Sequence, residues 1–321
     1  KNHELILKLN LSWSLYYPAC STEPWQLEGV LKPLVRDGYT IRAVENKTVV
    51  TDVWKGAKGN KWLPILKKYR QKYEPLTEVP WTKYTPKADM LALDNIYPDG
   101  HRIPDMFIGK NVMHLPTVKT HGHTTMTGAM KNAFGGLITE RRHHCHKKIH
   151  EVLVDLLSIQ KEIHPKQFAV MDGTVCGNGE GPRTMMPVIK NRILASHDQV
   201  AIDAISAKMM GFDPMSIPFI KIAHDKGLGV GDPDQIDVIG EDISKENFHF
   251  TTGRSPVIFF DQFFRKGHGS FIEPLLFHTP LFKTAIFGSA FYHDKIWYNT
   301  IGRHRINKFM KTEWGTLFKK Y

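Results

Sequence analysis

The stretch NVMHLPTVKTHGHTTMTGAMKNAFGG (residues 111–136) decides the fold, because it combines a strand, a polar loop and a helix in direct succession. Residues 111–119 have the apolar content of a strand, with Pro116 at an end or a bulge. Residues 125–134 then suit the start of a helix. A strand followed by a helix is the repeating unit of a mainly parallel sheet that is covered by helices.

The same alternation continues along the chain. Further strands are expected at residues 4–11, 39–45, 89–94, 167–172 and 235–240, and helices within residues 21–38, 59–73, 145–163, 198–210 and 215–226. This pattern predicts an α/β fold, a mainly parallel sheet with helices on both faces, as one domain over residues 1–252. An aromatic, basic C-terminal extension is expected over residues 253–321.

Composition narrows the class of protein. The chain has 321 residues, of which 41% are hydrophobic and 23% charged, as in an ordinary globular protein. No apolar run reaches the roughly 18 residues of a membrane-spanning helix. The three cysteines (Cys20, Cys145 and Cys176) are far apart, which argues against an iron–sulfur cluster or structural zinc in this chain. We expect a cytoplasmic protein, although the first residue is Lys1 and a removed signal peptide is compatible with the sequence.

The loop after residues 111–119 carries a dense set of polar side chains: Lys119, His121, Thr127, Lys131 and Asn132. A helix that starts near Thr125 would direct free N–H groups at an anion, and the lysines would add positive charge. We expect a phosphate or carboxylate site here, with His121 as an acid/base group or metal ligand. The alternative is a capped helix whose threonines and lysines are solvated.

A second polar segment, DGTVCGNGEGP (residues 172–182), follows another expected strand. Asp172 and Glu180 flank its glycines, so they could bind a divalent cation or serve as a base. The segment matches neither common nucleotide-binding pattern. The alternative is a flexible turn whose acidic residues have no shared role.

Residues 253–321 hold 16 aromatic residues and contribute +7 of the net charge of +11. Basic residues interleaved with phenylalanine and tryptophan suit a membrane surface, or less readily a single-stranded nucleic acid. Packing of the aromatic side chains on the main domain or on a protein partner is favoured over both, because aromatic side chains are usually buried.

Four segments together resemble the family of proteins with the domain of unknown function 362, over about residues 4–242. The segments are LKLNL with STEP, LPTVKTHGHTTMTGAMKNAFGG, MDGTVCGNGEGP and ASHDQVAIDAISAKMMG. The matching residues are Lys8, Asn10, Thr22–Pro24, Lys119, His121, Thr127, Gly128, Lys131, Asn132, Asp172, Gly179, Pro182, Asp198, Ala201, Asp203 and Gly211. The resemblance implies no general activity. Many members append a ferredoxin-like segment with cluster-binding cysteines, which this chain lacks.

A short segment is also similar to nickel-pincer lactate racemases, through His121 and Lys131 within a Thr-Gly-Ala-x-Lys pattern. In those enzymes the lysine tethers the cofactor and a histidine moves a proton. This similarity implies racemase-like chemistry as an alternative function.

The sequence therefore predicts an enzyme that acts on an anionic small molecule. The expected catalytic residues are His121, Lys131 and Asp172, the expected binding residues are Lys8, Asn10, Lys119, Thr127, Asn132 and Asn178, and the expected metal ligands are Asp172 and Glu180. The cofactor is left open, with a divalent metal as the candidate and no iron–sulfur cluster expected. A non-catalytic anion-binding protein, or an accessory protein that contacts a membrane surface through residues 253–321, is the other function class.

Overall fold

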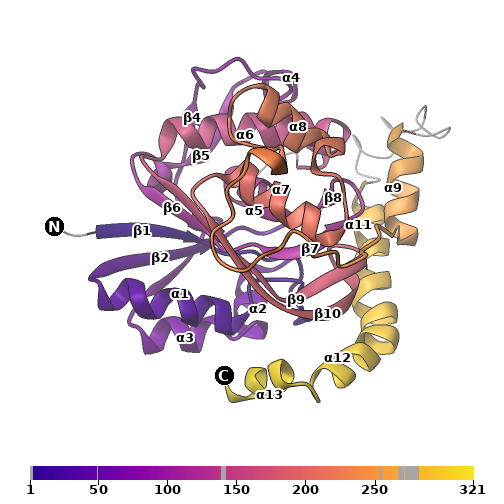
Figure 1. Ribbon diagram of the computed structural model, residues 1–321. Coiled ribbons are helices and arrows are strands. Elements are labelled where there is room, and N and C mark those ends of the chain that lie inside the picture. Colours follow the sequence, from indigo (N-terminus) through magenta and orange to yellow (C-terminus); the bar gives the residue numbers. More distant parts are fainter. Residues whose placement is uncertain (1–2, 49, 139–141, 254, 267–270, 272–281) are drawn as a thin grey trace.

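The fold is built around one large sheet (Figure 1). The computed structural model describes all residues except 1–2, 49, 139–141, 254, 267–270 and 272–281. The order of the main sheet is β3-β2-β1-β6-β9-β7-β8, and β10 pairs with β9. Its strands are β1 (His3–Lys8), β2 (Tyr39–Glu45), β3 (Lys72–Pro75), β6 (Asn111–His114), β7 (Thr117–His121), β8 (Thr125–Met126), β9 (Gln167–Glu180) and β10 (Thr184–Ser196). All its pairings are parallel except β7 with β8 and β9 with β10, so the predicted α/β fold with a mainly parallel sheet is confirmed.

Helices pack on both faces of this sheet, and β4 (Trp81–Tyr84) and β5 (His101–Pro104) form a separate antiparallel pair. Figure 1 shows α1, α2 and α3 on one face and α5, α6, α7 and α8 on the other. The α-helices of the body are α1 (Pro24–Arg36), α2 (Val53–Gly59), α3 (Trp62–Lys68), α4 (Leu93–Ile96), α5 (Gly128–Leu137), α6 (Ile149–Ile163), α7 (Gln199–Met210) and α8 (Pro218–Asp225). Short 3-10 helices are η1 (Asp105–Phe107), η2 (Arg142–Lys148), η3 (Pro214–Ser216) and η4 (Pro233–Gln235). Each face has its own apolar core.

The glycine-rich segment 172–182, which was expected to follow a strand, is itself mostly strand, and this corrects the prediction. Residues 172–180 form the second half of β9, paired with β7 on one edge and with β10 on the other, and residues 181–182 begin the turn to β10. Its glycines allow this close packing, because a Cβ at Gly177 would lie 2.3 Å from the sulfur of Met185 and one at Gly181 only 1.7 Å from the carbonyl oxygen of Thr120. Here glycine permits strand pairing instead of breaking the strand.

Two expected strands are absent from the described structure. In residues 89–94, the backbone N–H groups of Leu91, Ala92 and Leu93 donate to the carboxylate of Asp155, at 2.7 to 3.0 Å. That carboxylate takes the donors that a strand would need, and the chain forms the single turn of α4 instead. Residues 236–239 are also irregular, and Ile239 is 98% exposed, so its side chain has no packing partner that would favour a strand.

The C-terminal extension has two parts. The first comprises α9 (Pro256–Lys266) and α11 (Phe282–Ala290), which we call the outer helices. The second comprises a π-helix (Phe291–Gly302), α12 (Arg303–Phe309) and α13 (Glu313–Lys320) and returns toward α1 and α3 (Figure 1). Phe277, one of the aromatic residues noted in the sequence, lies outside the described residues. The domain boundary at residue 252 stays a prediction.

The second part packs on the body through its aromatic rings. Phe318 stacks on Tyr16 with ring centroids 3.8 Å apart, and Trp314 lies 4.8 Å from Trp25. The outer helices differ, because several of their phenylalanines face solvent. The expected packing therefore describes the second part of the extension only.

Candidate functional site

A cavity of about 600 Å³ lies where the carboxyl ends of β1 and β7 meet α5 and the turn after β9. Ligands of α/β proteins bind at this edge of a parallel sheet. Seven of the sequence-predicted residues line it, namely Lys8, Asn10, His121, Thr127, Lys131, Asn132 and Glu180. The other three, Lys119, Asp172 and Asn178, are not among its lining residues.

The inner side of the cavity holds a set of mutually bonded polar residues that we call the polar network: Lys8, Asn10, Glu45, Lys119 and Asn132. The Lys8 ammonium pairs with Glu45 at 2.8 Å, and both side chains are buried. Lys119 donates to Asn10 Oδ1 at 2.5 Å, and Asn10 Nδ2 donates to Asn132 Oδ1 at 3.2 Å. These contacts tie the end of β1 to β7 and α5.

Lys119 is fully buried and does not line the cavity. It also donates to the carbonyl oxygen of Cys20 at 2.6 Å and to Thr117 Oγ1 at 2.9 Å. Burial lowers the pKa of Lys119 to about 8. Three acceptors satisfy all three donors of an ammonium group, so Lys119 supports the site without facing it.

The N-terminus of α5 is occupied by a side chain of the protein, which corrects the predicted ligand contact. The carboxylate of Asp203 in α7 accepts from the N–H groups of Ala129 at 2.5 Å and Met130 at 3.0 Å. Gly128 makes room for it, with a φ of +72° and a carboxylate where a Cβ would be. The helix also begins at Gly128, three residues later than expected, because Thr125 and Met126 pair with β7.

Lys131 differs from the lysines of the polar network. Its ammonium makes no hydrogen bond or ion pair with a described residue, and the nearest aromatic contact is the ring of Phe134, 5.6 Å from Nζ. Burial, together with the charges of Lys119 and Arg142, lowers the pKa of Lys131 to about 7. A half-buried amine with this pKa can bind an anion when protonated and accept a proton when neutral.

Two arginines add positive charge to the cavity, and sequence reasoning missed both. Arg142 donates to the carbonyl oxygens of Ile138 at 2.7 Å and Gly135 at 2.8 Å, which satisfies the C-terminus of α5. Arg183 follows β9, and its Nη1 is buried without a hydrogen-bond partner among the described residues. Together the described side chains that line the cavity comprise four cations and two carboxylates. The cavity therefore favours an anion.

His121 is buried and stays neutral. Its Nδ1 accepts a hydrogen bond from the backbone N–H of His123 at 3.1 Å, so the ring proton lies on Nε2. Burial, and next the charge of Lys131, hold the pKa of His121 well below its usual range. A neutral imidazole with Nε2–H is a hydrogen-bond donor for an oxygen that gains negative charge.

The structure does not bring the two expected metal ligands to one wall of the cavity. Asp172 is fully buried and accepts from the backbone N–H of Thr174 at 2.7 Å and from Trp25 Nε1 at 3.1 Å. Burial raises the pKa of Asp172 to about 6. Glu180 does line the cavity. Among the described residues, no group of three or more histidine, cysteine or acidic side chains is arranged to hold a metal ion.

Asn178 has a structural contact. Its Oδ1 accepts from the backbone N–H of Thr251 at 2.9 Å, and Gly179 bridges to Thr252 next to it. Asn178 thus fixes the segment that leads into the C-terminal extension.

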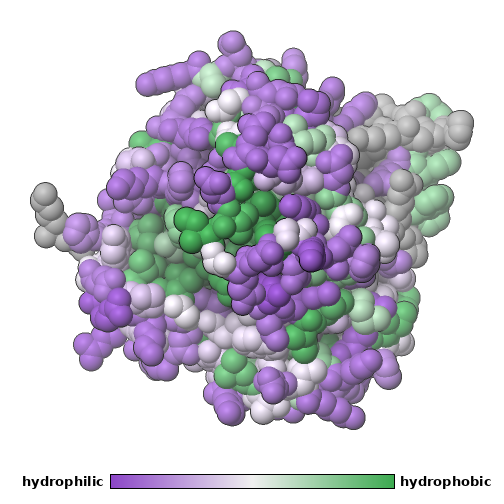
Figure 2. All heavy atoms as spheres, viewed as in Figure 1, coloured by the Kyte–Doolittle hydropathy of each residue, from purple (hydrophilic) through white to green (hydrophobic). Residues whose placement is uncertain are grey.

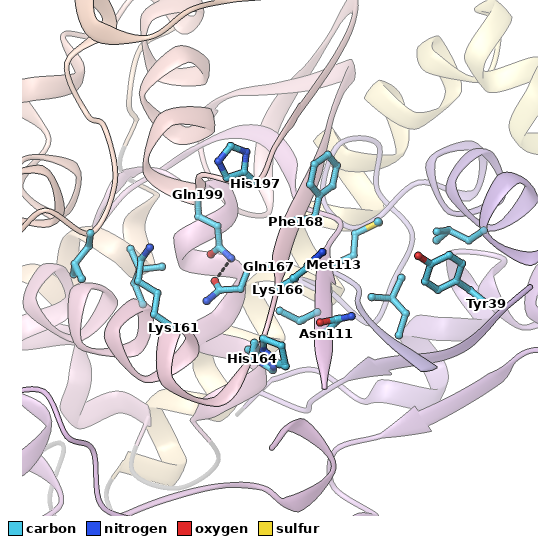
Figure 3. A pocket seen from close by; sticks show the side chains of 16 residues that line it. Tyr39, Asn111, Met113, Lys161, His164, Lys166, Gln167, Phe168, His197 and Gln199 are labelled. Atoms are coloured by element: carbon cyan, nitrogen blue, oxygen red, sulfur yellow. Dashed lines mark hydrogen bonds between the residues drawn. The ribbon is translucent and has the colours of Figure 1, made fainter. Parts of the chain in front are cut away.

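A second groove, of about 570 Å³, lies at the opposite, amino ends of β1, β6 and β9 (Figure 3). Its labelled side chains include Lys161, Lys166 and Phe168, and Gln199 donates to Gln167 across it. None of the sequence-predicted site residues lines this groove. Figure 2, which has the view of Figure 1, shows an apolar hollow near the centre of this face of the molecule.

Residues 5–208 match the family described as Domain of unknown function (DUF362). The chain belongs to this family. The match covers more than half of the chain, and it confirms the resemblance that the four sequence segments indicated. The family description assigns no activity.

A curated relative is the thylakoid-associated protein sll1697 of Synechocystis sp., which is 29% identical over 124 residues. This alignment covers 36% of the present chain and 37% of that protein, so the match spans little more than a third of the relative. No solved structure is similar enough to match.

The matched family region contains the polar network and Lys131, and it ends within α7, which carries Asp203. The outer helices lie beyond it, yet Val257, Phe260, Phe264 and Ile286 line the cavity. Sequence reasoning treated the extension separately and missed this contribution. No helix in the described part of the chain is long and apolar enough to cross a membrane.

Proposed function

We propose that the chain is an enzyme that binds an anionic small molecule, with a phosphate or carboxylate group, in the cavity beside His121 and Lys131. The carrying observation is that Lys131 has no ionic or hydrogen-bond partner among the described residues, while it lines a cavity with excess positive charge. Polar groups buried in a folded protein are normally bonded. A cationic side chain left open at a cavity fits a ligand that supplies the missing partner.

The chemistry that fits these residues is proton transfer. In its neutral form the Lys131 amine accepts a proton from an acidic C–H or O–H of the substrate and becomes an ammonium. The Nε2–H of His121 donates a hydrogen bond to the substrate oxygen on which negative charge then collects. A lysine pKa of about 7 favours this role near neutral pH, since both protonation states are populated.

The test is anion binding by calorimetry, with sulfate and acetate as probes because their charge is constant between pH 6 and pH 9. Lys131→Ala should weaken binding roughly 10- to 150-fold at pH 6, which corresponds to a lost hydrogen bond to a charged group. Lys32→Ala, which removes an exposed lysine in the middle of α1, is the matched control and should bind as the parent does.

The pH dependence sharpens the test. Binding by the parent protein should weaken as the pH rises through the pKa of Lys131, because the ammonium loses its charge. Equal affinity of Lys131→Ala and the parent at pH 6 would rule the proposed site out. Native mass spectrometry of protein from its own source, with a retained ligand as the expected result, would then identify the substrate.

A second function is favoured by one separate observation, the exposed phenylalanines of the outer helices. Phe287 is 72% exposed and Phe259 is 51% exposed. Side chains of this kind can insert into the surface of a bilayer, and one relative is named a thylakoid-associated protein. Binding to anionic lipid vesicles in the absence of any soluble ligand is the result that a membrane-surface accessory function requires.

A further inference from the structure

We propose that the ligand of this cavity is an amphiphilic anion: a phosphate or carboxylate head group that carries an apolar chain. The head group lies on the cationic side of the cavity, and the chain runs along the outer helices. This inference rests on the proposed function, and it names the substrate class of the same site.

The head-group end is defined by Arg183. Its Nη1 is buried and lacks a hydrogen-bond partner among the described residues, although it lines the cavity. The neighbouring carboxylate of Asp294 is already engaged, because its Oδ1 accepts from Trp13 Nε1 at 2.6 Å. An unpaired guanidinium donor matches the oxygens of a phosphate or carboxylate.

The outer helices add an apolar wall to the cavity. Val257, Phe260 and Phe264 contribute to it from α9, and Ile286 contributes from α11. Phe260 lines the cavity and is at the same time 57% exposed, so the apolar wall continues to the protein surface. A purely polar ligand would leave these side chains in contact with water, which is unfavourable.

The apolar surface extends beyond the cavity wall. Phe259 and Phe263 stack in α9 with centroids 6.5 Å apart, and Phe287 and Phe291 do so at 6.2 Å where α11 meets the π-helix. Figure 2 shows apolar side chains over α9, beside the grey residues. An apolar chain that leaves the cavity past Phe260 would therefore meet more apolar surface.

The size of the cavity also favours a ligand with an apolar chain. Its volume of about 600 Å³ lies in the range of about 300–1,000 Å³ that encloses ligands much larger than a phosphate or acetate ion. A head group alone would occupy only the cationic end. An attached chain would fill the part that the outer helices enclose.

The test is a chain-length series of monomeric alkyl phosphates (inorganic, butyl, octyl and dodecyl phosphate), measured by calorimetry. The affinity should rise with each methylene that enters the apolar wall, by about fourfold per fully buried methylene. Octyl trimethylammonium, with the same chain and the opposite charge, should not bind. Affinity that does not depend on chain length would overturn the amphiphile inference and leave the anion site in place.

Two variants separate the two ends of the ligand. Ile286→Asn should reduce the gain per methylene without changing the affinity for inorganic phosphate, and Arg183→Met should weaken all phosphates by a similar factor. Ile296→Asn is the matched control, because Ile296 is an exposed residue of the same extension that does not line the cavity. Unchanged binding of every alkyl phosphate by both Arg183→Met and Lys131→Ala would instead contradict the anion site itself.

The source of the amphiphile is decided with vesicles of phosphatidylcholine that contain a phosphomonoester lipid. Transfer of that lipid to the protein, in a fraction freed of vesicles, would support the inference with a membrane lipid as the ligand. Binding of dodecyl phosphate without such transfer would support it with a free amphiphile. If the lipid is not transferred and no alkyl phosphate binds, the inference is overturned.

Discussion

The polar groups on the inner side of the cavity are bonded to one another, whereas some of those on its outer side have no bonding partner. On the inner side, the polar network joins Lys8 to Glu45 and links Lys119, Asn10 and Asn132 in a chain of hydrogen bonds. On the outer side, toward the turn after β9 and the outer helices, Arg183 keeps a donor without a partner. Lys131 of α5, which lines the cavity and is half-buried, also lacks one among the described residues.

The difference indicates which residues serve the fold and which serve a ligand. A buried polar group that is fully bonded stabilises one arrangement of the backbone, and its loss leaves its partners unsatisfied. A polar group left open lowers stability, and a protein retains it where something else completes its bonding. Substitutions in the two regions should therefore change stability in opposite directions.

The largest effect is expected for Asn132→Leu, on the inner side. Asn132 is 2% exposed, and it bonds the carbonyl oxygen of Lys8 at 3.1 Å as well as Asn10. Leucine keeps the volume but leaves these groups unsatisfied, so the free energy of unfolding should fall by about 3 kcal/mol. Urea denaturation measures this change.

Thr127→Val is the matched control, at the N-terminus of the same helix. The Oγ1 of Thr127 is buried with no hydrogen-bond partner among the described atoms, so its removal should leave stability unchanged or slightly higher. An equal loss of stability in the two variants would remove the distinction between the bonded and the open residues.

The next largest change in the free energy of unfolding is expected for one of two arginines near the turn after β9. Arg305 donates from Nη1 to the carbonyl oxygens of Thr184 at 3.1 Å and Met185 at 2.9 Å. Arg305→Met should therefore lower the free energy of unfolding by about 1.5–3 kcal/mol. Arg183→Met, which removes a buried and unpaired donor, should not lower it. Thermal melting of both variants in ligand-free buffer tests the contrast, and a larger loss for Arg183→Met would reverse our assignment.

The parts of the fold that local chemistry controls could be predicted from the sequence. The expected strand 39–45 coincides with β2, and Asp198 caps α7 as expected, accepting from the N–H groups of Val200 and Ala201. These features depend on residues that are neighbours in the chain. The sequence also indicated that His121 and Lys131 lie close together after a strand, and both line the cavity, while their role in binding a ligand stays a prediction.

The features of the fold and of the site that could not be predicted depend on contacts between distant parts of the chain. The Asp203 carboxylate that occupies the start of α5 lies 74 residues from its partner Ala129. The glycines of β9 read as a turn until β7 and β10 are known to pack against them. Arg183 follows a glycine-rich motif and looks like an ordinary surface charge, because its burial depends on the folded turn. Tertiary contacts of this kind leave no local pattern.

The smallest change in the free energy of unfolding is expected for Lys131→Met, and its sign and pH dependence both follow from the pKa of Lys131. The pKa of Lys131 is lowered from 10.5 to about 7 in the folded protein, because burial disfavours the ammonium. Below about pH 7 the lysine is charged in both the folded and the unfolded state, so the folded state bears the full free-energy cost of burying the ammonium. Between pH 7 and 10.5 unfolding takes up a proton, and the penalty disappears as the pH rises.

Methionine fills similar space without a charge, so Lys131→Met should be more stable than the parent at pH 6, by about 1 kcal/mol, since water reaches this half-buried side chain and reduces the penalty. The difference should shrink toward zero near pH 10. Chemical denaturation at both pH values measures it, and Lys32→Met on the exposed face of α1 should show no difference at either pH. A variant that is less stable than the parent at pH 6 would mean that Lys131 belongs with the bonded residues of the inner side, and the open cation on which the proposed site depends would be lost.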